Sequence, residues 1–261
     1  MGFEDILYDK HDGRADVTIN RPDRLNAFRD VTIDEMTAAF EEAAADSTIG
    51  VITVRGVGGR AFSSGGDVQW ESAFDANAGR SLMRRMLRLS QAMRLSGKPI
   101  VAAVDGYCVG GGNELHMLCD LSIATERSRF GQVGPRMGSS PIWYGTQLLQ
   151  LSVGDKRARE IVYLCRQYPA QRAFEMGWIN AVVPNDGLDA AVDEWCEELL
   201  DKSSQSMRIA KASFNVLSDL LMSSVVSGFE QLAMAHATPE FHEGVDAFLD
   251  KRQPDFRSFR K

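Results

Sequence analysis

Two glycine-rich turns, about forty-five residues apart, are the part of this sequence best suited to chemistry. The first is Ser64-Gly65-Gly66-Asp67 and the second is Gly110-Gly111-Gly112-Asn113-Glu114. Glycine lets a backbone approach a ligand closely and adopt dihedral angles that a Cβ forbids. Two such turns can direct two backbone N–H groups at one carbonyl oxygen, which is an oxyanion hole. Each turn by itself is equally compatible with a tight loop of an ordinary α/β protein.

The elements that must position these turns follow from the apolar pattern. Strand-like runs at 51–54 and 100–104 lead to the two turns, and a short helix at 113–118 follows the second turn, where its N-terminus would favour a negative oxygen. Strands alternating with helices predict an α/β fold. Further strands are predicted at 15–19, 121–124 and 179–183, and further helices at 31–43, 80–95, 188–202, 207–217, 220–235 and 240–251.

Composition restricts the class of protein. With 261 residues, a net charge of −7 and 44% hydrophobic residues, the chain predicts a globular protein without a basic nucleic-acid face. We find no run of about eighteen apolar residues, no metal-ligand spacing among four cysteines and four histidines, and no signal peptide. We therefore expect a cytoplasmic enzyme without a metal, a membrane partner or a nucleic-acid partner. The basic cluster at 80–94 is interpreted as a solvated helix face, with attraction of an anionic cofactor as the alternative.

Further motifs occur around the turns in a fixed order. They are Asn20-Arg21-Pro22-Asp23-Arg24-Leu25-Asn26-Ala27-Phe28, Lys98-Pro99 through Gly106-Tyr107, Cys119-Asp120-Leu121-Ser122-Ile123-Ala124 and Phe130-Gly131-Gln132. Together with the two turns, this series resembles the enoyl-CoA hydratase/isomerase (crotonase) superfamily over nearly the whole chain.

The resemblance implies a specific architecture. It predicts a crotonase (ClpP-like) spiral of β-β-α units over residues 1–187 and a helical C-terminal region over 188–261 that makes trimer contacts. The chain would then form a homotrimer or homohexamer. The apolar run at 222–234 is interpreted either as core or as a subunit interface.

The resemblance also implies site residues. The N–H groups of Gly66 and Gly111 would bind the oxygen of an acyl-CoA thioester, and Glu114 would transfer a proton, although a glutamate favoured by a helix N-terminus is its structural alternative. The superfamily's second catalytic glutamate falls at Gly134. Coenzyme A, as part of the substrate and not as a permanent cofactor, would contact Arg24, Leu25, Ala27, Ser64, Gly65, Asp67 and Val68, and Lys251 of a neighbouring subunit.

A closer match involves the segment Gly131 to Ser139, together with Cys165-Arg166-Gln167-Tyr168 and Lys251 to Phe256. These motifs are similar to the branch containing 1,4-dihydroxy-2-naphthoyl-CoA synthase and 2-ketocyclohexanecarboxyl-CoA hydrolase. The branch's catalytic aspartate falls at Pro141, its C-terminal tyrosine at His236 and its loop tyrosine near Phe74. His236 can exchange a proton near neutral pH, or it can be a helix-surface histidine.

The same branch implies an acyl pocket. We expect it to be apolar and aromatic, suited to a ring or a bulky chain, with Gln132 and Tyr144 as the groups able to hold a water or a bicarbonate ion. Its expected lining is Phe74, Gln132, Gly134, Ser139, Pro141 and Tyr144.

The sequence thus predicts an acyl-CoA enzyme that works through a thioester enolate. Its expected reaction is hydration or isomerisation of a cyclic or bulky enoyl-CoA. The alternatives are a ring-opening hydrolase of a β-keto cyclic acyl-CoA and a non-catalytic acyl-CoA-binding protein.

Overall fold

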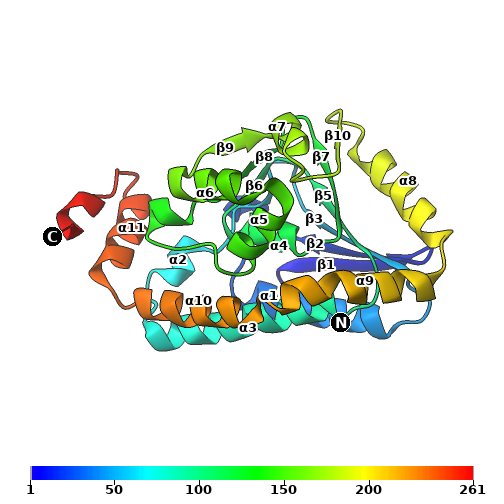
Figure 1. Cartoon of the computed structure of the whole chain (residues 1–261), viewed down its shortest axis with the longest axis horizontal. Helices are drawn as coiled ribbons and strands as arrows, with labels where there is room; N and C mark the ends of the chain where they lie inside the picture. The colour runs from blue at the N-terminus through cyan, green and yellow to red at the C-terminus, as the bar shows by residue number, and fades with distance from the viewer. Residues whose placement is uncertain (1, 261) are drawn as a thin grey trace.

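Two β-sheets form the frame of the protein in the computed structural model, which describes residues 2–260 (Figure 1). The six-stranded sheet has the order β1-β2-β3-β5-β7-β10, with an antiparallel β1–β2 hairpin and parallel pairing elsewhere. Its strands are β1 (Ile6–His11), β2 (Arg14–Ile19), β3 (Val51–Gly56), β5 (Ile100–Val104), β7 (Leu121–Thr125) and β10 (Ala181–Val183). The four-stranded sheet consists of β4 (Ala61–Ser63), β6 (Tyr107–Val109), β8 (Arg129–Gly131) and β9 (Gln167–Pro169), in that order.

The chain passes from the six-stranded sheet to the four-stranded sheet three times. Each of the parallel strands β3, β5 and β7 is followed directly by a three-residue strand of the second sheet, β4, β6 and β8. The turn at Gly65 follows the pair β3–β4. The turn at Gly110 follows the pair β5–β6 and precedes the pair β7–β8. The α/β prediction is confirmed, and the repeated strand pairs place both glycine turns at the ends of neighbouring strands of the second sheet.

Helices surround the sheets. The N-terminal half contains η1 (Pro22–Arg24), α1 (Asp30–Ala45), α2 (Val68–Glu71), α3 (Ala76–Arg94), α4 (Gly111–Met117) and η2 (Gly134–Met137). The remainder contains α5 (Gly145–Val153), α6 (Asp155–Leu164), α7 (Ala170–Glu175), α8 (Leu188–Leu200), α9 (Ser204–Asp219), α10 (Met222–Ala235), α11 (Pro239–Leu249) and η3 (Phe256–Phe259).

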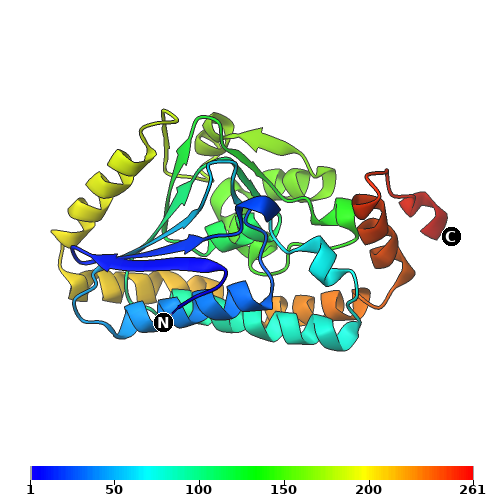
Figure 2. The ribbon, with the colours of Figure 1, turned by 180° about the vertical axis from the view of Figure 1, so that it is seen from behind.

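The central strands bury both faces, as parallel strands between helices do. Val101, Ala103 and Ile123 point to one side and pack against α8, whereas Ala102 and Val104 point into the larger core with α1 and α3. Figure 2 shows α8 on the far side of the sheet from α1 and α3. The alternation with a period of two therefore separates two apolar layers around one sheet.

The helical C-terminal region begins at Leu188, where it was predicted. Helix α10 runs beside α3, and α11 with the C-terminal segment lies at one end of the molecule, against α2 and η2 (Figure 1). Most of the arginines on α3 are paired with acids, for example Arg80 with Glu230 and Arg88 with Glu41, as a solvated face would be. Within residues 2–260, no single helix is long and apolar enough to cross a membrane, although α9 and α10 together have the length and composition across a 56° bend.

Candidate active site

The two glycine turns lie against each other. A Cβ built on Gly65, whose φ is +98°, would lie 2.7 Å from the backbone nitrogen of Gly111. A Cβ on Gly112 would overlap the backbone of Ser63. The contact between the turns therefore requires glycine on both sides, which explains the composition of these two stretches.

The N–H groups expected to form the oxyanion hole are available to a ligand. Phe28 forms a parallel bridge with Gly66, in which the Phe28 N–H donates to the Gly65 carbonyl (2.8 Å) and the Asp67 N–H donates to the Phe28 carbonyl (3.0 Å). This bridge uses the groups on either side of Gly66. Among the hydrogen bonds of residues 2–260, neither the Gly66 N–H nor the Gly111 N–H is a donor. Both glycines line the same small cavity, of about 80 Å³.

Glu114 lies in this cavity and is buried. Its Oε1 accepts a hydrogen bond from the Trp143 N–H (2.8 Å), and the Gly145 N–H also stabilises the carboxylate. A Cβ on Gly145 would lie 2.7 Å from this Oε1, so glycine is needed there. Burial raises the pKa of Glu114 well above its usual value, and the two N–H groups oppose that rise only in part. A carboxyl with a raised pKa that is held in place beside two free N–H groups can act as a general base.

A second carboxyl, which the sequence analysis did not identify, enters the same cavity. Glu71 is the last residue of α2 and lines the cavity together with Glu114. A Cβ built on Gly66 would overlap the Glu71 carboxyl, with its Cδ only 2.9 Å away. Burial, with a smaller contribution from the negative charge of Asp67, raises the pKa of Glu71 to about 7. The expectation that Glu114 is the one carboxylate of the site is therefore wrong.

His236 also lines the cavity, from the end of α10, and is not a surface residue. Its ring packs edge-on against Phe74 (5.6 Å between centroids) and Phe241 (4.5 Å), and its Nδ1 is buried against Gly79 without a hydrogen bond in the described chain. Burial, helped by the nearby His242, lowers the pKa of His236 to about 4. The imidazole is therefore neutral at pH 7.

A larger groove of about 700 Å³ adjoins the cavity, and the two share Gly66. Among the residues that line it are six that the sequence analysis assigned to CoA, namely Arg24, Leu25, Ala27, Ser64, Asp67 and Val68. Gly65 lies behind this wall, against Gly111. Within the chain, Arg252 and not Lys251 lines the groove, and its guanidinium is bound to Glu243 (2.6 and 2.8 Å).

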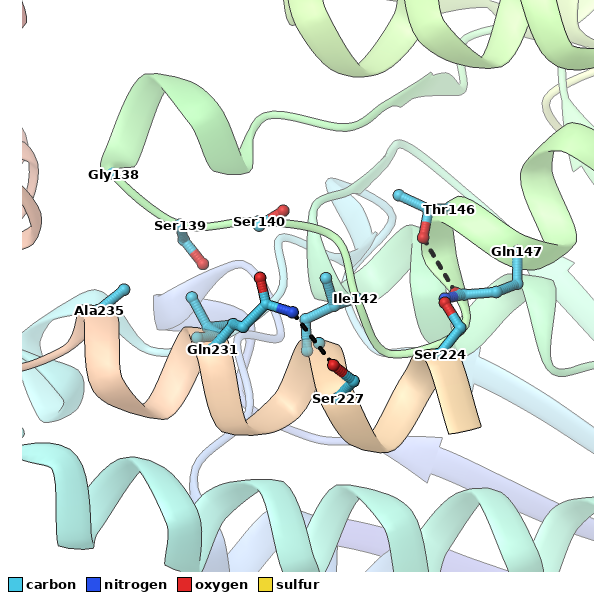
Figure 3. A pocket seen from close by; sticks show the side chains of 12 residues that line it. Gly138, Ser139, Ser140, Ile142, Thr146, Gln147, Ser224, Ser227, Gln231 and Ala235 are labelled. Atoms are coloured by element: carbon cyan, nitrogen blue, oxygen red, sulfur yellow. Dashed lines mark hydrogen bonds between the residues drawn. The ribbon is translucent and has the colours of Figure 1, made fainter. Parts of the chain in front are cut away.

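A side cavity of about 400 Å³ opens between the loop after η2 and helix α10, and it shares Ser139, Ser140, Ile142 and Leu232 with the small cavity. Figure 3 shows the Ser139 hydroxyl pointing toward Gln231 across the cavity. The Gln231 Nε2 donates to Ser227 Oγ (3.2 Å), and on the same side the Gln147 Nε2 donates to Ser224 Oγ (3.1 Å). Hydroxyl and amide groups make up most of the lining of this side cavity. The small cavity beside Glu114, by contrast, is lined mainly by apolar and aromatic side chains, namely Phe28, Leu82, Met83, Met86, Ile142, Trp143 and Leu232.

Several residues predicted for the acyl pocket lie outside all of these cavities. Tyr144 is fully buried, with the Arg94 guanidinium 5.0 Å from its ring centroid, and Gln132 is fully buried with no hydrogen bond to its amide among residues 2–260. Pro141 packs behind Gly145, and Phe74 packs behind His236. Gly134 accepts a hydrogen bond from the Ser139 N–H (3.0 Å) and thereby holds the loop. Of the predicted set, Ser139 alone lines a cavity beside Glu114.

The part of the chain that the structure describes places no group of three or more His, Cys, Asp or Glu side chains where they could share a metal ion. The polar groups that line the small cavity are the carboxyls of Glu71 and Glu114, the imidazole of His236, the hydroxyls of two serines and the backbone N–H groups of two glycines, namely Ser139, Ser140, Gly66 and Gly111.

The comparisons with known proteins agree with this geometry. Residues 9–259 match the family model described as enoyl-CoA hydratase/isomerase. An enoyl-CoA hydratase from Mycobacterium avium subsp. paratuberculosis K-10 has a similar structure, with a TM-score of 0.87 and 28% identity over 98% of this chain and 99% of that chain. An enoyl-CoA hydratase/isomerase from Xanthobacter autotrophicus Py2 has a TM-score of 0.86 and 30% identity over 97% and 100% of the two chains.

A third structure, an enoyl-CoA hydratase/carnithine racemase from Magnetospirillum magneticum, has a TM-score of 0.80 and 27% identity over 98% of this chain and 96% of that chain. These matches extend over both sheets and the C-terminal helices, and they confirm the predicted crotonase fold. The chain belongs to the enoyl-CoA hydratase/isomerase family.

Proposed function

We propose that this protein hydrates or isomerises a cyclic or bulky enoyl-CoA through a thioester enolate. One observation carries the proposal: Gly66, Gly111 and Glu114 line a single small cavity, and Gly66 also lines the adjacent 700 Å³ groove. The volume of the groove is large enough for a ligand such as coenzyme A. The small cavity is suited to the reacting atoms at the acyl end of that ligand. Coenzyme A enters as part of the substrate.

The proposed chemistry follows from the two N–H donors. The thioester oxygen accepts hydrogen bonds from Gly66 and Gly111, and these bonds strengthen as negative charge develops on that oxygen. Glu114, fixed by the Trp143 N–H, takes up or delivers a proton in this reaction. Removal of one donor of this kind typically costs about 10²–10³ in rate.

The side cavity supports the choice of acyl group. Its volume of about 400 Å³ gives room for a ring or a branched chain beyond the reacting carbons. Because Ser139, Ser140 and Gln231 face this space, we propose that the acyl group carries a hydroxyl or carbonyl that these side chains bind. A purely apolar ring would leave such groups without partners, which lowers affinity.

We also propose that the chain assembles as a trimer or a dimer of trimers. Helix α9 leaves Phe214 81% exposed, and the neighbouring Leu220 is 74% exposed. Large apolar side chains gathered on one helical surface are typical of a subunit interface. In such an assembly Lys251 of one subunit is proposed to meet a CoA phosphate bound to the next.

Hydrolytic ring opening of a β-keto cyclic acyl-CoA is the second candidate. The observation in its favour is His236, a neutral imidazole in the wall of the cavity, because a neutral imidazole can deprotonate a water that attacks a ring ketone. The branch resemblance noted above supports the same reaction. The third candidate function is non-catalytic binding of an acyl-CoA.

Product analysis tests these candidates. The protein is incubated separately with crotonyl-CoA, cyclohexenecarboxyl-CoA and 2-ketocyclohexanecarboxyl-CoA, and the products are weighed by mass spectrometry. Gain of one water with the ring retained, or an unchanged mass with a moved double bond, supports the proposed function. A ring-opened acid supports the hydrolase, and binding without turnover supports the non-catalytic protein.

A further inference from the structure

Glu71 occupies an unusual place for a carboxyl that has only a structural role. Helix α2 begins at the Asp67 cap, whose side chain accepts a hydrogen bond from the Trp70 N–H (3.4 Å), and it ends one turn later at Glu71. That turn brings the Glu71 carboxyl back over Gly66, as the predicted overlap with a Gly66 Cβ shows. The carboxyl therefore lies against one of the two residues that supply the oxyanion hole.

The Glu71 carboxyl has no partner in the described part of the chain, although the residue is half-buried. Among residues 2–260, no hydrogen bond or ion pair of the structure involves either of its oxygens. By contrast, Glu114 in the same cavity is held by the Trp143 N–H, and Asp67 is paired with Arg21 (2.9 Å). A half-buried carboxyl without a partner costs stability, so a chain under no other constraint would be expected to carry an amide or an apolar residue there.

The cavity that the two carboxyls line is so small that a group bound in it would be near both of them. The cavity of about 80 Å³ holds only a few atoms beyond a water molecule, and both glutamates line it. The negative charge of Glu71 makes a small contribution to the raised pKa of Glu114, as expected for two carboxyls that line one cavity. The other titratable groups nearby are Asp67, which caps the same helix, and His236; His242 of α11, the helix packed against α2, acts on His236.

We infer that Glu71 is the second proton-transfer residue of the site and acts at the α-carbon of the acyl group, while Glu114 acts at the β- or γ-carbon. This inference rests on the proposed function and supplies the acid that is missing at Gly134. The assignment follows from position. The Glu71 carboxyl lies against Gly66, whose N–H is proposed to bind the thioester oxygen, and the α-carbon is two bonds from that oxygen. Glu114 is anchored instead by the Trp143 N–H of the loop before α5.

In hydration, the Glu114 carboxylate takes a proton from the water whose oxygen bonds to the β-carbon. The electron pair of the double bond becomes the new bond between the α-carbon and the carbonyl carbon, and the carbonyl electrons move onto the oxygen held by Gly66 and Gly111. The enolate then takes a proton at the α-carbon from the Glu71 carboxylic acid. Glu114 ends protonated and Glu71 ionised, and passage of one proton from the first to the second restores the enzyme with one water added.

Hydrogen–deuterium exchange separates the two glutamates. Butyryl-CoA, which has no double bond, is incubated in D₂O with the wild-type protein, Glu71→Gln and Glu114→Gln, and deuterium at the α-carbon is measured by mass spectrometry. Exchange requires the oxyanion hole and the group nearest the α-carbon only. We expect Glu71→Gln to lose exchange by about 10²-fold or more and Glu114→Gln to retain it within about threefold. Glu41→Gln, at an exposed glutamate paired with Arg88, is the matched control and should equal the wild type.

A second readout is the pH profile of enoyl-CoA hydration. Because Glu71 donates a proton in this direction, wild-type activity should decline as the pH rises through about 7, and Glu71→Gln should remove that alkaline limb along with most of the activity. Retained binding of CoA thioester by Glu71→Gln, measured by calorimetry, shows that the variant is folded. If it does not fold, Glu71→Asp, which withdraws the carboxyl from Gly66 by one methylene, should show the same loss of exchange.

Failure of the role proposed for Glu71 can be distinguished from failure of the proposed function. A wild-type protein that hydrates an enoyl-CoA while Glu71→Gln keeps exchange and the same pH profile overturns the role of Glu71 and leaves the proposed function intact. Loss of exchange in Glu114→Gln with retention in Glu71→Gln overturns the assignment of the α-carbon. A wild-type protein that neither exchanges butyryl-CoA nor converts any enoyl-CoA overturns both.

Discussion

Replacement of Glu114 by glutamine is the sharpest test of the proposed chemistry. Glutamine keeps the length of the side chain and an oxygen that can accept from the Trp143 N–H, so the loop before α5 should stay in place. It removes the one property that matters for turnover, the ability to take up a proton. We therefore expect Glu114→Gln to bind a CoA thioester nearly as the wild type does and to lose hydration activity.

The magnitude follows from the role. A positioned general base typically contributes about 10²–10⁴ in rate, which corresponds to about 2.7–5.4 kcal/mol of activation free energy. Unfolding would not explain such a loss. Because burial raises the pKa of Glu114 in the folded state, the ionised side chain costs stability as the pH rises, and a neutral glutamine avoids that cost. The melting temperature of Glu114→Gln at pH 8 should therefore be no lower than that of the wild type.

The assay is the steady-state hydration of the best enoyl-CoA at pH 7 to 8, followed by the loss of absorbance of the conjugated thioester, with calorimetry for binding. Glu41→Gln is the control. A Glu114→Gln variant that keeps more than about a tenth of the wild-type kcat, outside the range expected for a general base, would show that Glu114 only anchors the loop. The neutral His236 would then become the leading candidate base, and ring-opening hydrolysis would become the favoured reaction.

Three further predictions follow from the same geometry. Gly66→Ala should reduce kcat/KM at least tenfold, because its Cβ would enter the cavity where Glu71 lies; equal kcat/KM in the variant would contradict the oxyanion assignment. Sedimentation at micromolar concentration should show a trimer or hexamer, and Phe214→Glu, at a residue 81% exposed, should dissociate it; a stable wild-type monomer would refute the interface. Glu71→Gln should raise the melting temperature by ~2–8 °C at pH 8 but not at pH 4, since the folded-state pKa of about 7 lies above the unfolded value; an equal shift at both pH values would show that charge burial is not the cause.

The long elements of this fold were predictable because each carries its own periodic signal. The helix at α10 and the strand β5 lie within two residues of their predicted ranges. The second sheet was not predicted, since its strands β4, β6 and β8 are three residues long and too short for an alternation to be visible. Their pairing depends on contacts between segments far apart in the sequence, such as Tyr107 with Arg129.

The site was predictable where glycine was required by backbone contact. Gly65 and Gly111 could be identified because they lie where the two turns approach each other, whereas a Cβ on Gly66 would meet the Glu71 carboxyl. Tyr144 and Gln132 could not be placed, since a polar or aromatic residue in a loop gives no sign of whether it faces a cavity or the core. The position of Glu71 could have been predicted from the sequence. It lies one helical turn after the Asp67 cap, and this spacing brings its side chain back to the glycine turn.

The energetics of the cavity tie the two carboxyls to the reaction. Raising the pKa of a carboxyl by burial destabilises the folded state above that group's normal pKa, and here two glutamates bear that cost in one small cavity. The like charges interact, so ionisation of one opposes ionisation of the other, and the pair favours a state with one proton between them. That state contains one base and one acid at the same pH, which is what addition of water across a double bond requires. A protein that only bound acyl-CoA would gain nothing from this arrangement, because an amide at either position would fill the same space without the cost in stability.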